Sequence, residues 1–93
     1  MVSAFQGNTA GHTSFARCNS QNQALFSVNA GISCEEALEH ASLLTDCINK
    51  LTLQAGMNDD SSAAWAAHYL GDMVKAIIDD VTTSLQFPTE DRP

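Results

Sequence analysis

Two side chains four residues apart, His68 and Asp72, have the clearest potential for chemistry in this sequence. Residues at that spacing share one face of a helix, where an imidazole and a carboxylate can bind a metal or act as a dyad. In an antiparallel pair of helices Cys47 comes within a turn of them, and a second subunit can supply further ligands. A structural zinc site needs four ligands that enclose the metal, and this set is incomplete. We therefore predict no metal, no cofactor and no catalytic residue, and we keep an enzymatic or metal-binding helical bundle as the alternative.

The other side chains that can react each have a simpler explanation. Cys34 stands in the first turn of a predicted helix, where the dipole favours a thiolate, but Glu35 and Glu36 beside it oppose that charge. The carboxylate pairs at 59–60 and 79–80 are neighbours in sequence, so their side chains diverge on a helix. No glycine-rich phosphate loop and no Cys-x-x-Cys motif is present. The sequence contains no convergent catalytic group.

Composition and charge exclude several classes of function for this chain of 93 residues. Four basic residues against eleven acidic ones give a net charge of −7, which disfavours nucleic acid and anionic membrane surfaces as partners. No apolar run approaches the roughly 20 residues that span a bilayer. The first seven residues contain no basic residue and lead into no apolar core, so no signal peptide is expected. Three cysteines, an odd number, argue against a disulfide framework, and we predict a cytoplasmic protein.

The predicted elements all follow the first quarter of the chain. Residues 1–23 are rich in Ser, Thr, Asn, Gln and Gly and show no periodicity, so we predict a mobile N-terminal arm. The apolar run at 25–28 predicts a short extended segment, which opens a helical hairpin domain over 24–86. Nothing else is typical of a strand, so the predicted fold class is all-α. Residues 87–93 form a polar tail.

Two long amphipathic helices make up most of the predicted domain. Ser33 and Glu36 form a capping box, after which apolar residues recur at steps of four and three, and Gly56 is placed to cap the C-terminus. These signals predict a helix over 34–55. A second apolar stripe between residues 63 and 81, opened by an Asn or Asp cap at 58, 59 or 60 and ended before Pro88, predicts a helix over 60–85. The short link makes the two helices antiparallel neighbours.

The second helix carries another apolar stripe, Trp65, Tyr69, Met73 and Ala76, that faces away from the first helix. Burying one large apolar side chain contributes about 1.5–3 kcal/mol, so leaving the stripe in water is a substantial loss. Some of it can pack under residues 24–32. The alternative that we favour is a homodimer, with two hairpins forming a four-helix bundle. The candidate interface consists of Trp65, Tyr69, Met73, Ala76, Phe26 and Val28.

One polar face of the same helix is a candidate surface for a second protein. It carries His68, Asp72, Lys75 and Asp79, although Lys75 and Asp79 can equally form a surface ion pair with no docking role. With no convergent catalytic group, an acidic surface and surplus apolar residues, the sequence favours a non-enzymatic interaction or regulatory module that acts as a homodimer. The protein partner is unidentified.

Three stretches of the sequence resemble a known family of short bacterial proteins, the domain-of-unknown-function family 3077. They are Phe26-x-Val28-x-x-Gly31, Ala37-Leu38-x-x-Ala41-Ser42-x-Leu44 and Trp65-Ala66-Ala67-His68-Tyr69-Leu70-x-x-Met73-x-Lys75-Ala76. The likeness covers about residues 25–82, and the run from Trp65 to Leu70 is its specific part. The resemblance implies a small helical protein of a bacterial cytoplasm, and it assigns no activity or site residue.

Overall fold

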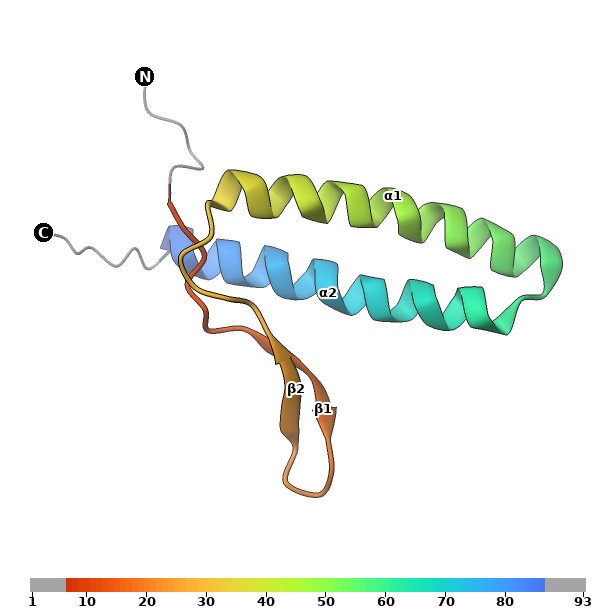
Figure 1. The fold of residues 1–93 in the computed structure, drawn as a ribbon, viewed down its shortest axis with the longest axis horizontal. Coiled ribbons are helices and arrows are strands. Elements are labelled where there is room, and N and C mark those ends of the chain that lie inside the picture. The colour runs from red at the N-terminus through yellow and green to blue at the C-terminus, as the bar shows by residue number, and fades with distance from the viewer. Residues whose placement is uncertain (1–6, 87–93) are drawn as a thin grey trace, which may run out of the picture.

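A β-hairpin precedes a helical hairpin in this protein. The computed structural model describes residues 7–86, so the predicted tail at 87–93 and the first six residues of the predicted arm lie outside it. Strands β1 (Ser14–Cys18) and β2 (Gln23–Ser27) pair antiparallel and are followed by the long helices α1 (Cys34–Asn58) and α2 (Ser61–Gln86) (Figure 1). No helix among these residues is long and apolar enough to cross a membrane.

The predicted all-α class is wrong, because the chain forms a two-stranded sheet before the helices. Phe15 lies opposite Phe26 in the strand register, and their ring centroids are 5.4 Å apart. The turn between the strands uses Asn19 and Asn22, which both have a positive φ, a conformation that asparagine tolerates. The Asn19 side chain accepts a hydrogen bond from the Gln21 backbone N–H at 2.9 Å. The predicted extended segment at 25–28 is therefore the second strand of a hairpin.

The segment before β1, predicted as part of a mobile arm, is bound to the rest of the chain. Thr9 is buried, and its backbone N–H donates to the Ile32 carbonyl at 2.7 Å. The Thr9 hydroxyl donates to the Asn29 carbonyl and accepts from the Ile32 N–H. Residue 8 also forms an isolated antiparallel bridge with Ser33. Residues 7–13 thus run beside the segment that leads into α1.

Both helices have the caps that their sequence predicts, with one change of position. The Ser33 hydroxyl accepts from the Glu36 N–H at 3.4 Å, which confirms the N-terminal cap of α1. The C-terminal cap is Asp59, with φ 52, so α1 continues three residues beyond the predicted end and includes Gly56. Asp60 caps α2 by accepting from the N–H groups of Ser62 and Ala63 at 3.0 and 3.2 Å.

The predicted helical hairpin is confirmed, and its seam has the predicted residues. Every member of the two stripes is buried or half-buried, namely residues 37, 41, 44, 48, 51 and 55 on α1 and residues 63, 67, 70, 74, 77 and 81 on α2. The most enclosed part, at the end near the β-hairpin, contains Cys34, Ala37 and Val81, with Leu38 and Ile77 against them. Cys34 is fully buried, so its thiol is a core side chain.

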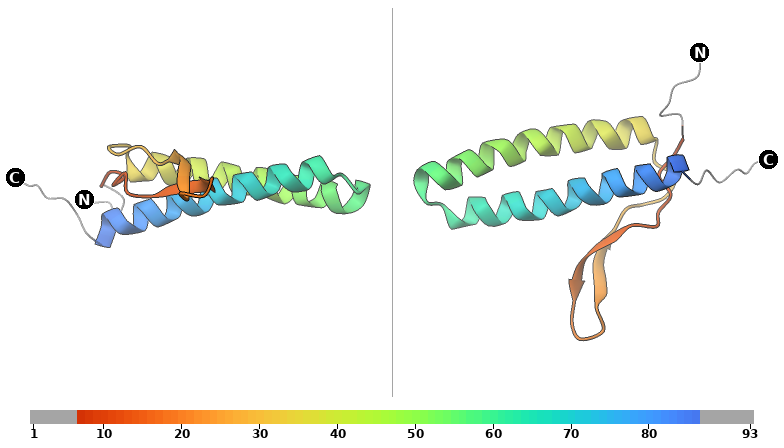
Figure 2. Two further views of the ribbon diagram at one scale, coloured as in Figure 1. Left: turned by 90° about the horizontal axis from the view of Figure 1, so that it is seen from below. Right: turned by 180° about the vertical axis from the view of Figure 1, so that it is seen from behind.

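The molecule is a single flat layer. The β-hairpin leaves the helical pair where α1 begins and α2 ends, and it projects past α2 on the side away from α1 (Figure 1; Figure 2). The overall extents are 53 × 40 × 15 Å, and the radius of gyration is 15.6 Å. A compact chain of this length has a radius of gyration of about 12 Å. Much of the surface of both helices is therefore open.

Candidate interaction surface

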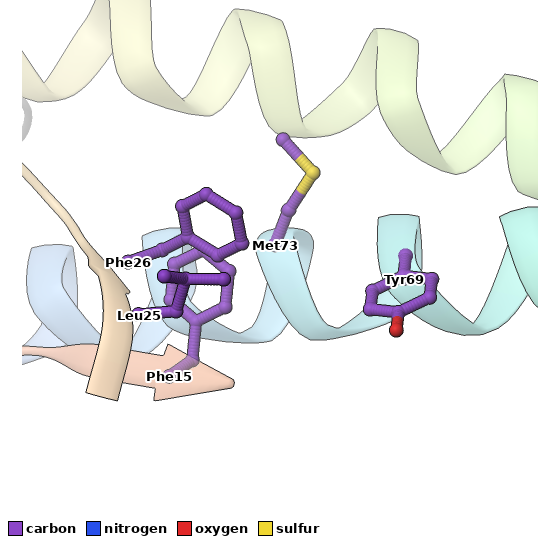
Figure 3. Close-up of a pocket in the computed structure, with 5 residues that line it drawn as sticks. All are labelled: Phe15, Leu25, Phe26, Tyr69 and Met73. Atoms are coloured by element: carbon purple, nitrogen blue, oxygen red, sulfur yellow. The ribbon is translucent and has the colours of Figure 1, made fainter. Parts of the chain in front are cut away.

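An apolar groove lies in the angle between the β-hairpin and α2. Its volume is about 440 Å³, and five side chains from three elements line it: Phe15 from β1, Leu25 and Phe26 from β2, and Tyr69 and Met73 from α2. Figure 3 shows the two phenylalanines and Leu25 gathered on one side, Tyr69 standing apart on the other and Met73 between them. Large parts of these side chains face solvent, with exposed fractions of 65% for Leu25 and 55% for Tyr69. We call these five residues the groove.

An aromatic cluster continues the apolar surface along α2 toward its N-terminus. Trp65 is 63% exposed, and its ring centroid lies 5.9 Å from that of His68 and 6.3 Å from that of Tyr69. His68 and Tyr69 in turn are 6.0 Å apart. A shallower hollow of about 350 Å³ is lined by Ser61, Ala64, Trp65 and His68. The groove and the aromatic cluster together form one continuous apolar face, which we call the α2 face.

The predicted interface residues divide between the open and the covered part of this face. Trp65, Tyr69, Met73 and Phe26 are exposed, as expected for the second stripe of an isolated hairpin. Ala76 continues that stripe but is buried within the single chain. Val28 is half-buried and does not line the groove; its N–H donates to the Thr13 carbonyl at 2.9 Å.

Asp80 holds the β-hairpin against α2. Its carboxylate is fully buried and accepts hydrogen bonds from four successive backbone N–H groups, those of residues 10–13, at 2.7 to 3.0 Å. Burial opposes the charged form most strongly, yet the hydrogen bonds from Gly11, His12, Thr13 and Ala10 together outweigh it, and the pKa of Asp80 is lowered. A carboxylate with such partners remains ionised inside the protein. Asp80 therefore positions the groove.

No role was predicted for Asp80 from the sequence, although the position of Asp80 on the helix indicates one. It follows Ala76 by four residues and so continues the line of Trp65, Tyr69, Met73 and Ala76 around α2. A charged residue at the next position of an apolar stripe is typical of a buried carboxylate with dedicated hydrogen-bond donors. Its donors could not be identified, because they lie nearly seventy positions away along the chain.

The predicted polar surface is present on α2 as a row of exposed charged groups. The His68 Nε2 atom lies 3.7 Å from the Asp72 Oδ2 atom, and both side chains are largely in solvent. The Lys75 ammonium donates to the Asp79 carboxylate at 2.8 Å, also in solvent. These groups can attract a charged partner, but they enclose no substrate.

In the part of the chain that the structure describes, His68 and Asp72 have no third metal ligand beside them. Cys47 is exposed on α1, and the described residues contain no group of three His, Cys, Asp or Glu side chains that could hold an ion. The structure thus brings His68 and Asp72 together as the sequence predicts and leaves Cys47 apart from them.

Charge is distributed unevenly between the two halves of the fold. All eleven acidic residues follow residue 34, whereas the first 33 residues contain no carboxylate and one cation, Arg17. Lys50 and Lys75 each pair with a carboxylate on their own helix, with Asp46 at 3.1 Å and Asp79 at 2.8 Å. Among the described residues, Arg17 is the cation whose guanidinium bonds only to neutral groups, the Asn22 carbonyl and the Ser14 hydroxyl. The β-hairpin is therefore weakly cationic and the helical pair strongly anionic.

Comparison with known proteins gives one match. Comparison with curated proteins found none, and comparison with solved structures found none either. The profile of a protein family described as "Protein of unknown function (DUF3077)" matches residues 9–84. This range includes the β-hairpin, all of α1, and α2 except its last two residues, so it also contains Asp80 and the whole α2 face. This extent is greater than the predicted resemblance over residues 25–82, because the family includes the first strand. The chain belongs to this family of unknown function.

Proposed function

We propose that this protein acts without catalysis, as a homodimer that presents an acidic surface to a partner protein. The observation that carries the proposal is the open α2 face, an uncharged apolar surface that continues from the groove to Trp65. Contiguous apolar patches of this kind mark interaction sites in soluble proteins. The catalytic alternative lacks a comparable observation, because the polar groups of α2 lie on an open surface.

The single-layer shape supports association. Folded domains normally bury apolar faces between two packed layers, whereas this molecule is 15 Å thick. Its buried apolar residues are small, with four alanines, one cysteine and one valine among the described residues. A segment of this size without a disulfide or a structural metal usually needs additional burial to be stable. A second layer, laid on the α2 face, would provide that burial.

The area of the α2 face is suitable for a dimer. Trp65, Tyr69, Met73, Leu25 and Phe26 have exposed fractions between 38% and 65%. Because large apolar and aromatic side chains bury about 150–250 Å² each, these five expose on the order of 500 Å² together. A standard interface buries about 800 Å² on each partner, and its rim supplies the remainder. The apolar centre of a stable interface is thus already present on one chain.

The charge distribution favours a second copy of this chain as the molecule that covers the α2 face. Each copy offers a weakly cationic β-hairpin and an anionic helical pair, so a contact between the hairpin of one copy and the helices of the other is attractive. The α2 face itself carries no like charges that would repel across a two-fold axis, apart from Asp72 at its edge. Surfaces that match themselves in this way form isologous dimers, the commonest oligomers of soluble proteins.

The partner protein is expected to be basic. The side of α1 away from the seam exposes four carboxylates, those of Glu35, Glu36, Glu39 and Asp46, of which only Asp46 is paired with a lysine among the described residues. In a dimer each copy keeps this side open, so the acidic surface is doubled. Such a surface accelerates encounter with cationic partners and weakens as salt is added.

Light scattering on the purified chain at micromolar concentration tests the proposal. We expect twice the chain mass for the wild type and a monomer for the Trp65→Ala/Tyr69→Ala double variant. Leu43→Ala/Leu53→Ala is the matched control, because these leucines are 64% and 63% exposed but lie on α1, outside the α2 face. The control should keep the dimer mass. A wild-type monomer, or a double variant with unchanged mass, contradicts the proposal.

Two further measurements address the partner and the alternative. An affinity pull-down should recover a basic protein. Charge reversal at Lys75 and Asp79, followed by the same pull-down, shows whether the face that carries these two residues contributes to binding of the partner. Unchanged recovery of the partner would exclude this face from the proposed surface. Stoichiometric zinc or iron in the native protein, lost on His68→Ala, would instead support the metal-binding alternative and contradict a purely non-enzymatic role.

A further inference from the structure

The α2 face has a projection at one end and a hollow at the other. Trp65 stands near the N-terminus of α2 with 63% of its surface exposed. Tyr69 and Met73, the helix residues of the groove, follow it by one and two turns. Among the described residues, the Trp65 indole stays largely uncovered and the groove stays open. These two features are complementary in shape and in chemistry.

We propose that Trp65 of each copy fills the groove of the other copy, in a dimer whose α2 helices cross antiparallel. This inference rests on the homodimer proposed above and adds its register. The centre of the groove on α2 lies about six residues from Trp65, or about 9 Å along the helix at 1.5 Å per residue. An antiparallel crossing with the two-fold axis near residue 68 places each Trp65 opposite the other copy's groove. In an isologous interface both contacts form together.

The chemistry of the groove is suitable for an indole ring. Its volume of about 440 Å³ is within the range of pockets that enclose small ligands, about 300–1,000 Å³. Phe15, Phe26 and Tyr69 supply aromatic edges and faces, which favour another aromatic ring over an aliphatic chain. A buried indole N–H needs an acceptor, and the Tyr69 hydroxyl is the one oxygen that the five lining side chains offer. Tyr69 thus belongs to the groove as its hydrogen-bonding member.

The same register brings oppositely charged parts of the two copies together. It carries the β-hairpin of one copy toward the N-terminal half of the other copy's α2, which begins beside Asp59 and Asp60. Within residues 7–86, Arg17 on β1 is the lysine or arginine that pairs with no carboxylate. It approaches an acidic link in the other copy, and the attraction fixes the direction of the crossing. A parallel crossing would leave Arg17 far from that link.

A complementation experiment tests this register. Trp65→Ala removes the projection and leaves the groove, whereas Met73→Glu places a carboxylate in the groove and leaves the projection. Each variant alone forms no intact tryptophan–groove contact, so its dimer should dissociate at least about 100-fold more readily than the wild type, as for loss of a central tryptophan hot spot. An equimolar mixture can form a heterodimer with one intact contact. Its dissociation constant should be about 10-fold or more lower than that of either variant alone.

Sedimentation equilibrium measures the wild type, the two variants and their mixture, and far-UV circular dichroism verifies that each variant keeps its helices. Should Met73→Glu fail to fold, Leu25→Glu blocks the same groove from the β-hairpin, at a side chain that is 65% exposed. If the wild type is monomeric, the homodimer fails and this register with it. If the wild type is a dimer but Trp65→Ala dissociates no more readily, the register alone is wrong. Two weakened variants whose mixture is no tighter than either would also overturn it, because Trp65 would then contact a different surface.

Discussion

Replacing Asp80 by asparagine should detach the β-hairpin from α2 and weaken the fold strongly. The carboxylate accepts from four backbone N–H groups at 2.7, 2.9, 2.8 and 3.0 Å and has no exposed surface. Asparagine has nearly the same shape, so the substitution leaves no cavity. It replaces one acceptor oxygen by an NH₂ donor that faces two N–H groups, and it removes the charge from the other two bonds.

The expected loss follows from those four bonds. A hydrogen bond to a charged group contributes about 1.5–3 kcal/mol and a neutral one about 0.5–1.5 kcal/mol, while a buried unsatisfied donor costs about 1–3 kcal/mol. The total loss is smaller than the sum of these contributions, because in the variant residues 7–13 can leave α2 and their N–H groups can bind water instead. We therefore expect the free energy of unfolding to fall by about 3–5 kcal/mol. A domain of this size has about 5–15 kcal/mol in total, so the effect is large.

Urea unfolding followed by circular dichroism measures the loss, and amide hydrogen exchange locates it. The N–H groups of residues 10–13 should lose protection first, before those of the helix seam. Asp79→Asn is the matched control, because the adjacent Asp79 accepts only from Lys75 in solvent, a contact worth a few tenths of a kcal/mol. A change below about 0.5 kcal/mol for Asp80→Asn would refute the reasoning, since a surface substitution has that effect.

Three other predictions follow from the fold. Leu44→Pro in the middle of α1 should cost about 3 kcal/mol or more, and loss of the helical circular dichroism signal would show it. Gly11→Ala should destabilise by about 1–3 kcal/mol in the same urea assay, because Gly11 has φ +77 and an added Cβ would lie 2.7 Å from another side chain. Because the pKa of Asp80 is lowered in the folded state, its contribution is complete above the unfolded pKa, about 3.9, and is lost as the pH falls through the lower folded value. The stability difference between wild type and Asp80→Asn should therefore shrink below about pH 4, and a constant difference down to pH 2 would contradict this.

The helices could be predicted from the sequence because their signals are local. The four-and-three spacing of apolar residues identified both seam stripes, and the capping box identified the start of α1 at Cys34. The end of α1 was predicted three residues early, because glycine is the usual left-handed cap and here Asp59 adopts that conformation. The prediction of a helical hairpin did not depend on the exact residue at which α1 ends.

The β-hairpin could not be predicted in the same way, because its stability depends on distant contacts. β1 has five residues with weak alternation, and it is held by Asp80 through bonds that join residues more than sixty positions apart. Only part of the candidate site could therefore be predicted. Helical periodicity identified Trp65, Tyr69 and Met73 as exposed, but the groove also needs Phe15 and Leu25 from the hairpin. A local pattern contains no information about which distant segment completes such a surface.

Fluorescence of Trp65 as a function of protein concentration tests the central claim most directly, because the chain has a single tryptophan. That side chain is 63% exposed in one copy and should be buried against apolar rings in the dimer. We predict that its emission shifts to shorter wavelength as the concentration rises through the dissociation constant, in step with the doubling of mass seen by light scattering. An emission that stays typical of a solvent-exposed indole while the mass doubles would contradict burial of the α2 face in the dimer.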